Sequence, residues 1–313
     1  MTASGGLRAI AIGECMVELA RGADGRFGLA YGGDTFNTAV YLARAGVATA
    51  YATALGDDPY SAGILALAAD EGIATDLIRC ETGRTPGLYL IETTAAGERT
   101  FHYWRDRSPA RELFDGEAWQ GLVEAIAGAR LVYLSGITLS LYSDTGLDRL
   151  AACLARARAG SAVIAIDGNY RPRGWGGDQA RARRVLERFW RLATIALPTF
   201  DDEAALWGDG DAGLTIRRLA ALGVGEVVVK RGAAGALVYG ADQGHLDVPV
   251  PEAVQPVDTT AAGDSFNGAY LAARLGGRPP AEAAVAGHRL AAVVIAHRGA
   301  IAPRAATAAV LRT

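Results

Sequence analysis

Cysteine, lysine and long apolar runs are all scarce in this chain of 313 residues. Its three cysteines, Cys15, Cys80 and Cys153, are scattered and have no metal-ligand spacing. Lys230 is the only lysine, and every other basic side chain is arginine or histidine. No run of about 18 apolar residues is present to span a bilayer, and no signal-peptide pattern is found at the N-terminus. These absences predict a reduced, cytoplasmic protein.

Charge of either sign is not concentrated in any part of the chain. The net charge is -3, with acidic and basic residues interspersed. This pattern excludes a basic stripe for nucleic acid and a polybasic membrane anchor. No linker, low-complexity segment or internal repeat divides the sequence, and 50% of its residues are hydrophobic. We therefore expect one main domain over residues 1–313.

Short apolar segments alternate with helical patterns along the chain. This order favours an α/β fold with a largely parallel sheet covered by helices on both faces. The predicted strands are Ala9–Ile12, Thr49–Leu55, Leu131–Leu134, Ala162–Asp167, Ile195–Pro198 and Glu226–Lys230. The predicted helices are Phe36–Ala45, Ser61–Glu71, Glu117–Ala127, Thr145–Ala159, Asp178–Trp190, Gly213–Leu222 and the long, mostly apolar Ala281–His297, which we expect to form core and a wall of a nucleotide pocket.

A hairpin interrupts that alternation. Leu88–Thr93 and Arg99–Trp104 are alternating strands around Thr94–Gly97, with no helical pattern beside them. Such a hairpin on an α/β body is a candidate lid, and its exposed edges are suited to pairing with a second subunit. The alternative is a peripheral hairpin without a function.

The segment Asp258–Leu271, DTTAAGDSFNGAYL, has the pattern of an anion-binding turn that opens into a helix. The small residues Ala261, Ala262 and Gly263 let the backbone approach an anion, and the first helical amides point toward it. Asp264 repels an anion, so its carboxylate is better explained as the base that deprotonates an attacking hydroxyl. The alternative is a helix cap with small residues for packing.

A second glycine-rich segment, Tyr31–Gly46, also leads into a helix, and it carries polar Asp34 and Asn37 after Gly33. Together the two segments resemble the paired signatures of the ribokinase-like (PfkB) carbohydrate kinases. The chain has neither a P-loop nor protein-kinase signatures. The resemblance implies a three-layer αβα, Rossmann-like domain with a small β-strand lid, drawn from about 15–32 and 86–106.

The resemblance further implies ATP with Mg²⁺, Asp264 as general base and an anion hole formed by the amides of Ala261 to Asp264. It places Asn169, Lys230, Gly232, Gly235, Ala261 and Gly263 at the ATP site. A simple glycine-bearing turn is the alternative for the loop after Lys230. The family has Gly where this chain has Ala261, which we expect to be tolerated if its backbone dihedrals are helical.

The magnesium motif of the family, Asn-x-x-Glu, is replaced here by Thr199–Glu203, TFDDE. Asp202 is therefore the candidate to reach Mg²⁺ through water, and whether Asp202 or Glu203 replaces the usual glutamate stays open. A monovalent cation such as K⁺ near Asp258 also stays open.

Arginine indicates the class of substrate, because guanidinium binds carboxylates bidentately. Arg105 follows the hairpin and Arg171 follows a core strand, so both are predicted to converge on a carboxylate. Several further segments, among them Gly97–Arg105 and Asn169–Arg173, closely resemble 2-keto-3-deoxygluconate kinases. This resemblance implies phosphorylation of a sugar acid at C6. The implied substrate residues are Gly33, Asp34, Asn37, Tyr89, Tyr103, Arg105 and Arg171.

Two other functions remain open on this evidence. A neutral-sugar kinase of fructokinase or ribokinase type would not need the two arginines, and a silent sugar-acid sensor would not need Asp264. The arginines could also form surface salt bridges, and Tyr103 could be a packing residue. The four histidines show no metal spacing, and we predict no role for them.

Overall fold

The computed structural model describes residues 8–311 apart from 23, 94–98, 117–118 and 242–243. Among these residues, the large sheet has nine strands in the order β13-β12-β11-β10-β9-β8-β1-β4-β5. Neighbouring strands are parallel except at β11–β12 and β12–β13. Its strands are β1 (Ala9–Ile12), β4 (Thr49–Gly56), β5 (Ile78–Glu81), β8 (Leu131–Ser135), β9 (Val163–Asp167), β10 (Ile195–Ala196), β11 (Glu226–Lys230), β12 (Ala236–Gly240) and β13 (Gly244–Val248).

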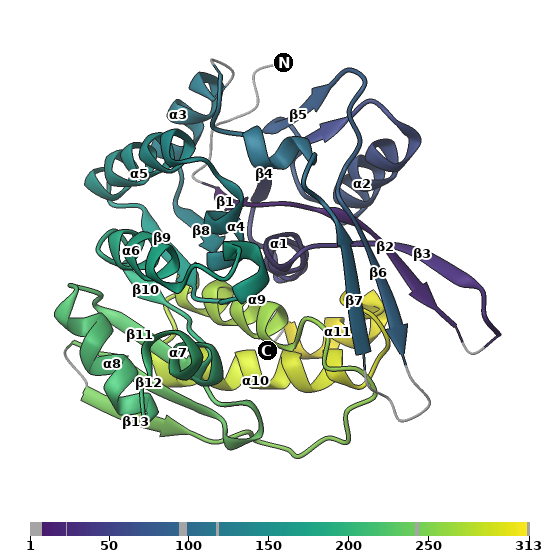
Figure 1. The fold of residues 1–313 in the computed structure, drawn as a ribbon. Coiled ribbons are helices and arrows are strands. Elements are labelled where there is room, and N and C mark those ends of the chain that lie inside the picture. Colours follow the sequence, from purple (N-terminus) through teal and green to yellow (C-terminus); the bar gives the residue numbers. More distant parts are fainter. Residues whose placement is uncertain (1–7, 23, 94–98, 117–118, 242–243, 312–313) are drawn as a thin grey trace.

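Helices cover both faces of this sheet (Figure 1). Successive strand residues point to opposite faces, so Ile10 and Ile12 pack in one core while Ala9 and Ala11 pack in the other. One face is covered by α3 (Gln120–Ala127), α5 (Asp144–Ala159), α6 (Gln179–Trp190) and α8 (Ala212–Ala221), the other by α1 (Asp34–Arg44), α2 (Pro59–Asp70), α9 (Ala262–Leu275) and α10 (Pro280–Ile295). The remaining helices are α4 (Gly136–Leu141), α7 (Phe200–Trp207), α11 (Arg304–Leu311) and the short 3₁₀ turns Pro109–Glu112, Pro172–Trp175 and Gly232–Ala234.

A second, four-stranded sheet stands beside the body, and its strands β2 and β3 project from it (Figure 1). We call it the small sheet. It consists of β2 (Met16–Arg21), β3 (Phe27–Gly32), β6 (Leu88–Thr93) and β7 (Arg99–Trp104), in the order β3-β2-β6-β7. β6 and β7 are the predicted hairpin, while the predicted turn at Thr94–Gly97 lies outside the described residues. The α/β fold with a small additional sheet is confirmed.

Local sequence explains where the helices begin. The Asp58 side chain accepts hydrogen bonds from the amides of Tyr60 and Ser61, and Pro59 occupies the first helical position of α2. Helix α9 differs, because its first flanking residue, Ala261, offers no side-chain cap. The amides of Gly263 and Asp264 are therefore available to a ligand, whereas that of Ala262 donates to the Thr259 carbonyl oxygen at 3.3 Å. No helix in the described part of the chain is long and apolar enough to cross a membrane.

Some strand predictions differ from the structure. The strands predicted from Thr49, Leu131 and Ala162 differ by one residue at one end from β4, β8 and β9, and β5 was not predicted. β10 ends at Ala196 rather than Pro198, because proline has no amide to donate to a strand ladder. The antiparallel strands β12 and β13 were not predicted; both are short, and glycines occupy their facing ends at Gly240 and Gly244.

Candidate active site

The two glycine-rich segments meet in space. Asp264 lies in the first turn of α9, and Asn37 lies in α1, at 227 positions' separation. The Asn37 side-chain amide donates a hydrogen bond of 2.9 Å to Asp264 Oδ2, and Thr38 Oγ1 donates one of 3.1 Å to the Asp264 carbonyl. The predicted sugar-binding helix and the predicted base therefore share one site.

Asp264 has an unusual proton affinity. Burial, followed by the nearby Asp34 carboxylate, raises the pKa of Asp264 to about 8, although the Asn37 hydrogen bond opposes the shift. Burial also raises the pKa of Asp34, which accepts a 2.7 Å hydrogen bond from Asn169 Nδ2. A carboxyl group that titrates near neutral pH is suited to take a proton from a hydroxyl. The structure places Asn169, which we assigned to the ATP side, beside Asp34.

Buried polar side chains form a layer beneath the start of α9. Lys230 Nζ donates to Asp167 Oδ2 at 2.7 Å and to Asn267 Oδ1 at 3.1 Å. Asn267 Nδ2 in turn donates to Asp167 Oδ2 at 2.6 Å and to the Tyr133 hydroxyl at 3.0 Å. A Cβ added to Gly263 would lie 3.6 Å from Lys230 Nζ. The only lysine of the chain is thus held directly behind the predicted anion hole.

The backbone of the anion turn corrects one expectation. We expected Ala261 to be tolerated in place of glycine if its backbone dihedrals were helical. Its φ of 58° and ψ of 18° lie in the left-handed region instead, so this expectation was wrong. Glycine adopts this conformation without steric cost, whereas a Cβ makes it unfavourable. The turn therefore contains local strain at the point where backbone amides face the site.

Two of the predicted site glycines are required by packing. A Cβ on Gly33 would lie 2.0 Å from the Glu14 carbonyl oxygen, and one on Gly235 would lie 2.3 Å from the Val248 carbonyl oxygen. Gly232, in the same loop as Gly235, has φ 55° and open space around it. Close backbone approach explains Gly33 and Gly235 whether or not either contacts a ligand.

The predicted aromatic residues of the small sheet lie together on one face. Tyr89 and Tyr103 are directly opposed in the β6–β7 register, with ring centroids 6.0 Å apart. The Tyr89 hydroxyl donates to the buried Glu18 carboxylate. Burial raises the pKa of Tyr103, while the nearby charges of Arg105, Arg171 and Arg173 act in the opposite direction. Three arginines therefore surround Tyr103, two of which the sequence predicted.

Both predicted arginines already have carboxylate partners. Arg105 pairs with Glu14, whose side chain is only 1% exposed. Arg171 Nη1 lies 2.9 and 3.0 Å from the two carboxylate oxygens of Asp202, the residue that we assigned to magnesium. Neither pair could be predicted from motifs, because each joins residues distant in the chain. Glu203, the other candidate at this motif, pairs with Arg218, and burial raises its pKa to about 7.

The described residues contain no cluster of three or more His, Cys, Asp or Glu side chains that could hold a metal ion. Asp258 accepts hydrogen bonds of 2.8 Å from the amides of Thr260 and Gly299. This carboxylate therefore fixes the entry to the anion turn.

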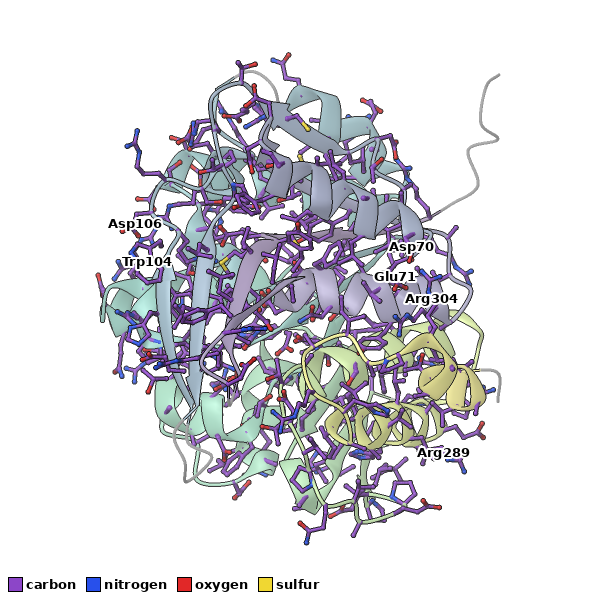
Figure 2. The ribbon with its side chains drawn as sticks, turned by 90° about the vertical axis from the view of Figure 1, so that its right-hand side faces the viewer. Asp70, Glu71, Trp104, Asp106, Arg289 and Arg304 are labelled. Atoms are coloured by element: carbon purple, nitrogen blue, oxygen red, sulfur yellow. The ribbon has the colours of Figure 1, made fainter. Side chains whose placement is uncertain are left out.

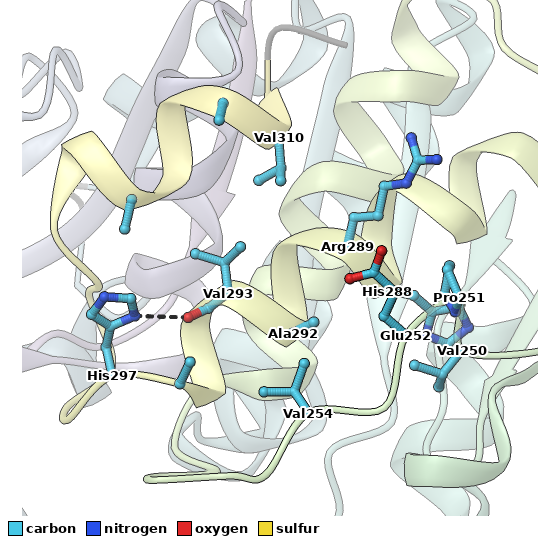
Figure 3. Close-up of a pocket in the computed structure, with 13 residues that line it drawn as sticks. Val250, Pro251, Glu252, Val254, His288, Arg289, Ala292, Val293, His297 and Val310 are labelled. Carbon is cyan, nitrogen blue, oxygen red and sulfur yellow. Dashed lines mark hydrogen bonds between the residues drawn. The ribbon is translucent and has the colours of Figure 1, made fainter.

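A cavity of about 660 Å³ opens between α10, α11 and the segment 250–254 (Figure 3). His288, to which we had given no role, lines it together with Val250, Glu252 and Ala292. The His288 ring packs edge-on against Phe266, two residues after Asp264, with centroids 5.0 Å apart. Burial lowers the pKa of His288, so its ring favours the neutral form. One lining residue of the cavity therefore packs against α9.

The chain is similar to known proteins over most of its length. The chain is 43% identical over 302 residues to 2-dehydro-3-deoxygluconokinase of Escherichia coli, covering 94% of this chain and 97% of that protein. It is 42% identical over 299 residues to the 2-dehydro-3-deoxygluconokinase of Dickeya dadantii, covering 93% and 96%. The crystal structure of a PfkB protein from Polaromonas sp. JS666 matches 98% of this chain and 99% of its own, with a TM-score of 0.83 and 26% identity. Residues 7–307 match the pfkB family of carbohydrate kinases, and the chain belongs to that family.

Proposed function

We propose that this kinase transfers the γ-phosphoryl group of ATP to the C6 hydroxyl of 2-dehydro-3-deoxy-D-gluconate. The observation that carries the proposal is the Asn37–Asp264 contact, which joins a sugar-binding helix to a base at the start of an uncapped helix. The relatives named 2-dehydro-3-deoxygluconokinase support the choice of substrate.

In this proposal each group of site residues has its own role in the phosphoryl transfer. Asp264 takes the proton of the C6 hydroxyl as that oxygen attacks phosphorus, and its raised pKa matches this role. The amides of Ala261, Gly263 and Asp264 bind the phosphate oxygens at the positive end of α9, and that of Ala262 joins them on leaving the Thr259 carbonyl oxygen. Lys230 adds a positive charge behind them. Mg²⁺, when bound, neutralises phosphate charge.

The sugar acid would lie between α1 and the small sheet. Gly33 allows close approach, and Asp34 and Asn37 bind hydroxyls near C6. Tyr89 and Tyr103 cover the carbon chain, and Arg105 and Arg171 bind the C1 carboxylate. Because Glu14 and Asp202 now neutralise these arginines, substrate binding requires each guanidinium to exchange or share its partner.

The nucleotide would extend from the anion turn along the Lys230–Gly235 loop. The cavity beside His288 is of a size and composition suited to the adenine base. Gly232, Gly235 and Asn169 complete the proposed ATP site. Asp202 would reach Mg²⁺ through water after releasing Arg171, and a K⁺ ion would bind near Asp258.

We also propose that two copies of the chain associate through the small sheet. Its outer strands β3 and β7 have one free edge each among the described residues. β3 exposes Phe27 and Leu29, which are 48% and 52% exposed. Edges and apolar residues of this kind are commonly covered by a partner.

A substrate panel tests the proposed reaction. We expect phosphorylation of the keto-acid, with its C1 carboxamide and neutral hexoses at least tenfold poorer in kcat/KM. A neutral-sugar kinase has one observation in its favour, since the ion pairs of Arg105 and Arg171 reduce the free positive charge. Equal use of the acid and of a neutral hexose would select that function. Binding of the acid without turnover would indicate a sensor.

A further inference from the structure

Arg173 is the third arginine beside Tyr103, and its surroundings differ from those of the other two. Its guanidinium carbon lies 6.0 Å from the centre of the Tyr103 ring, the same distance as that of Arg105. Arg105 and Arg171 each pair with a carboxylate. Within the described part of the chain, Arg173 forms no ion pair, and its one hydrogen bond, to the Phe101 carbonyl, is 3.5 Å long. Its charge is thus not neutralised by a neighbouring acid.

The position of Arg173 connects the two parts of the molecule. It lies in the 3₁₀ turn Pro172–Trp175 on the body, whereas Phe101 and Tyr103 lie in β7 of the small sheet. The rings of Phe101 and Tyr103 stack on the same face of the strand, with centroids 6.3 Å apart. Arg173 therefore reaches the face of the small sheet on which the predicted substrate tyrosines lie.

The energetic comparison favours Arg173 as a carboxylate ligand. The Glu14 side chain is buried, so transferring Arg105 to a substrate would leave that carboxylate without its partner. Arg171 is 55% exposed, but it contacts both carboxylate oxygens of Asp202 and must also give up or share a charged partner. Arg173 is exposed and gives up only a hydrogen bond at the outer limit of normal geometry. A guanidinium without an acidic partner can bind a carboxylate bidentately at little cost.

We infer that Arg173 binds the carboxylate of the sugar acid and is a specificity-determining residue of this kinase. The inference rests on the proposed function, since it assumes that the substrate is an acid. Arg173 adds a guanidinium that has no acidic partner before the substrate binds. Arg105 and Arg171 can then contact the substrate carboxylate while keeping their ion pairs with Glu14 and Asp202.

The test compares Arg173→Gln and Arg173→Lys with wild type, using the keto-acid and its C1 carboxamide as substrates. Arg184→Gln is the matched control, because Arg184 is exposed on α6, outside the site. We expect Arg173→Gln to lose roughly 10- to 100-fold in kcat/KM for the acid, the range for charge-assisted hydrogen bonds. The loss should fall on the KM for the acid, with the KM for ATP unchanged. Lysine should restore part of the activity, and the control should match wild type.

The carboxamide separates the possible outcomes. We expect Arg173→Gln to lose less than about threefold with the carboxamide, because a neutral group gains little from the guanidinium. Equal losses with both substrates would overturn the inference and assign Arg173 to holding the small sheet. An unchanged preference for the acid in Arg173→Gln would also overturn it while leaving the proposed function intact. If wild type itself shows no preference for the acid, the proposed function fails first.

Discussion

The surroundings of Asp264 determine the pKa of its carboxyl group. Burial and the Asp34 carboxylate keep its proton bound up to a pH of about 8. A base must be unprotonated to accept a proton, so kcat/KM of wild type should rise with pH and level off above about 8. Asp34→Asn removes one cause of the raised pKa, and the midpoint of the profile should move to lower pH. Initial rates between pH 5.5 and 9.5 would measure both profiles.

Replacing the base itself gives a second readout of the same residue. Asp264→Asn keeps the shape and the contact with Asn37 but cannot accept the proton. We expect kcat to fall about 10²- to 10⁴-fold with little change in ATP binding. A variant that keeps more than a third of wild-type turnover would show that Asp264 is not the base.

Ala261 offers a test of backbone strain. A left-handed alanine costs roughly 1–2 kcal/mol, whereas glycine loses about 0.4–1 kcal/mol more conformational entropy on folding. The strain term is the larger, so Ala261→Gly should raise the free energy of unfolding by up to about 1 kcal/mol, measured by urea denaturation.

Ser161 is the matched control for this substitution, because it has φ 69° in an exposed turn after α5. Ser161→Gly should stabilise the fold similarly and leave the kinetics unchanged, while Ala261→Gly should also alter the KM for ATP. No gain in stability in Ala261→Gly would show that the turn is not strained.

At the scale of elements, the sequence predicted the strands and helices whose positions follow from their apolar patterns. β1 and β11 have the predicted bounds, because their residues are buried on both faces and read as continuous apolar runs. β12 and β13 were not predicted. β13 is largely exposed, and its sequence has the pattern of a polar loop. α11 was missed as well, because it is short and its position depends on contacts with distant helices.

Those contacts centre on a buried ion pair that joins α1, α2 and α11. The Arg44 guanidinium donates two hydrogen bonds of 2.8 Å to Glu71, and both side chains are less than a tenth exposed. Arg304 adds a 3.3 Å contact to Glu71 and also pairs with Asp70 (Figure 2). Burial raises the pKa of Glu71, but the two arginines outweigh it and hold the pKa below its usual value.

Glu71→Ala should therefore destabilise the protein strongly, because it leaves the buried Arg44 charge without a carboxylate and with only neutral acceptors on Ala302 and Thr307. We expect a loss of about 3–5 kcal/mol in the free energy of unfolding. Asp148→Ala is the control, since it removes an exposed pair with Arg188 and should cost less than about 1 kcal/mol. Equal urea midpoints for the two variants would contradict this prediction.

At the scale of the whole molecule, the active site depends on tertiary contacts that motifs do not encode. The motifs predicted Asp264, Asn37 and the arginines, and the fold places Asn37 against Asp264 and Arg105 and Arg171 near Tyr103. They could not predict that Glu14 and Asp202 neutralise two arginines, because each ion pair depends on how separate elements pack. The cavity beside His288 also arises only when α10, α11 and the segment 250–254 are assembled.

The small sheet determines the last prediction, which concerns assembly. Phe27 and Leu29 are two residues apart on β3, so they point to the same side of an edge strand, and both are about half exposed. If two copies pair there, wild type should have twice the monomer mass in light scattering at micromolar concentrations. Leu29→Arg should shift it to the monomer, because an arginine in an apolar interface loses water without gaining a partner. Leu214→Arg, at a 40% exposed leucine on α8, should leave the mass unchanged. A monomeric wild type, or a Leu29→Arg variant with an unaltered mass, would rule out assembly through this strand.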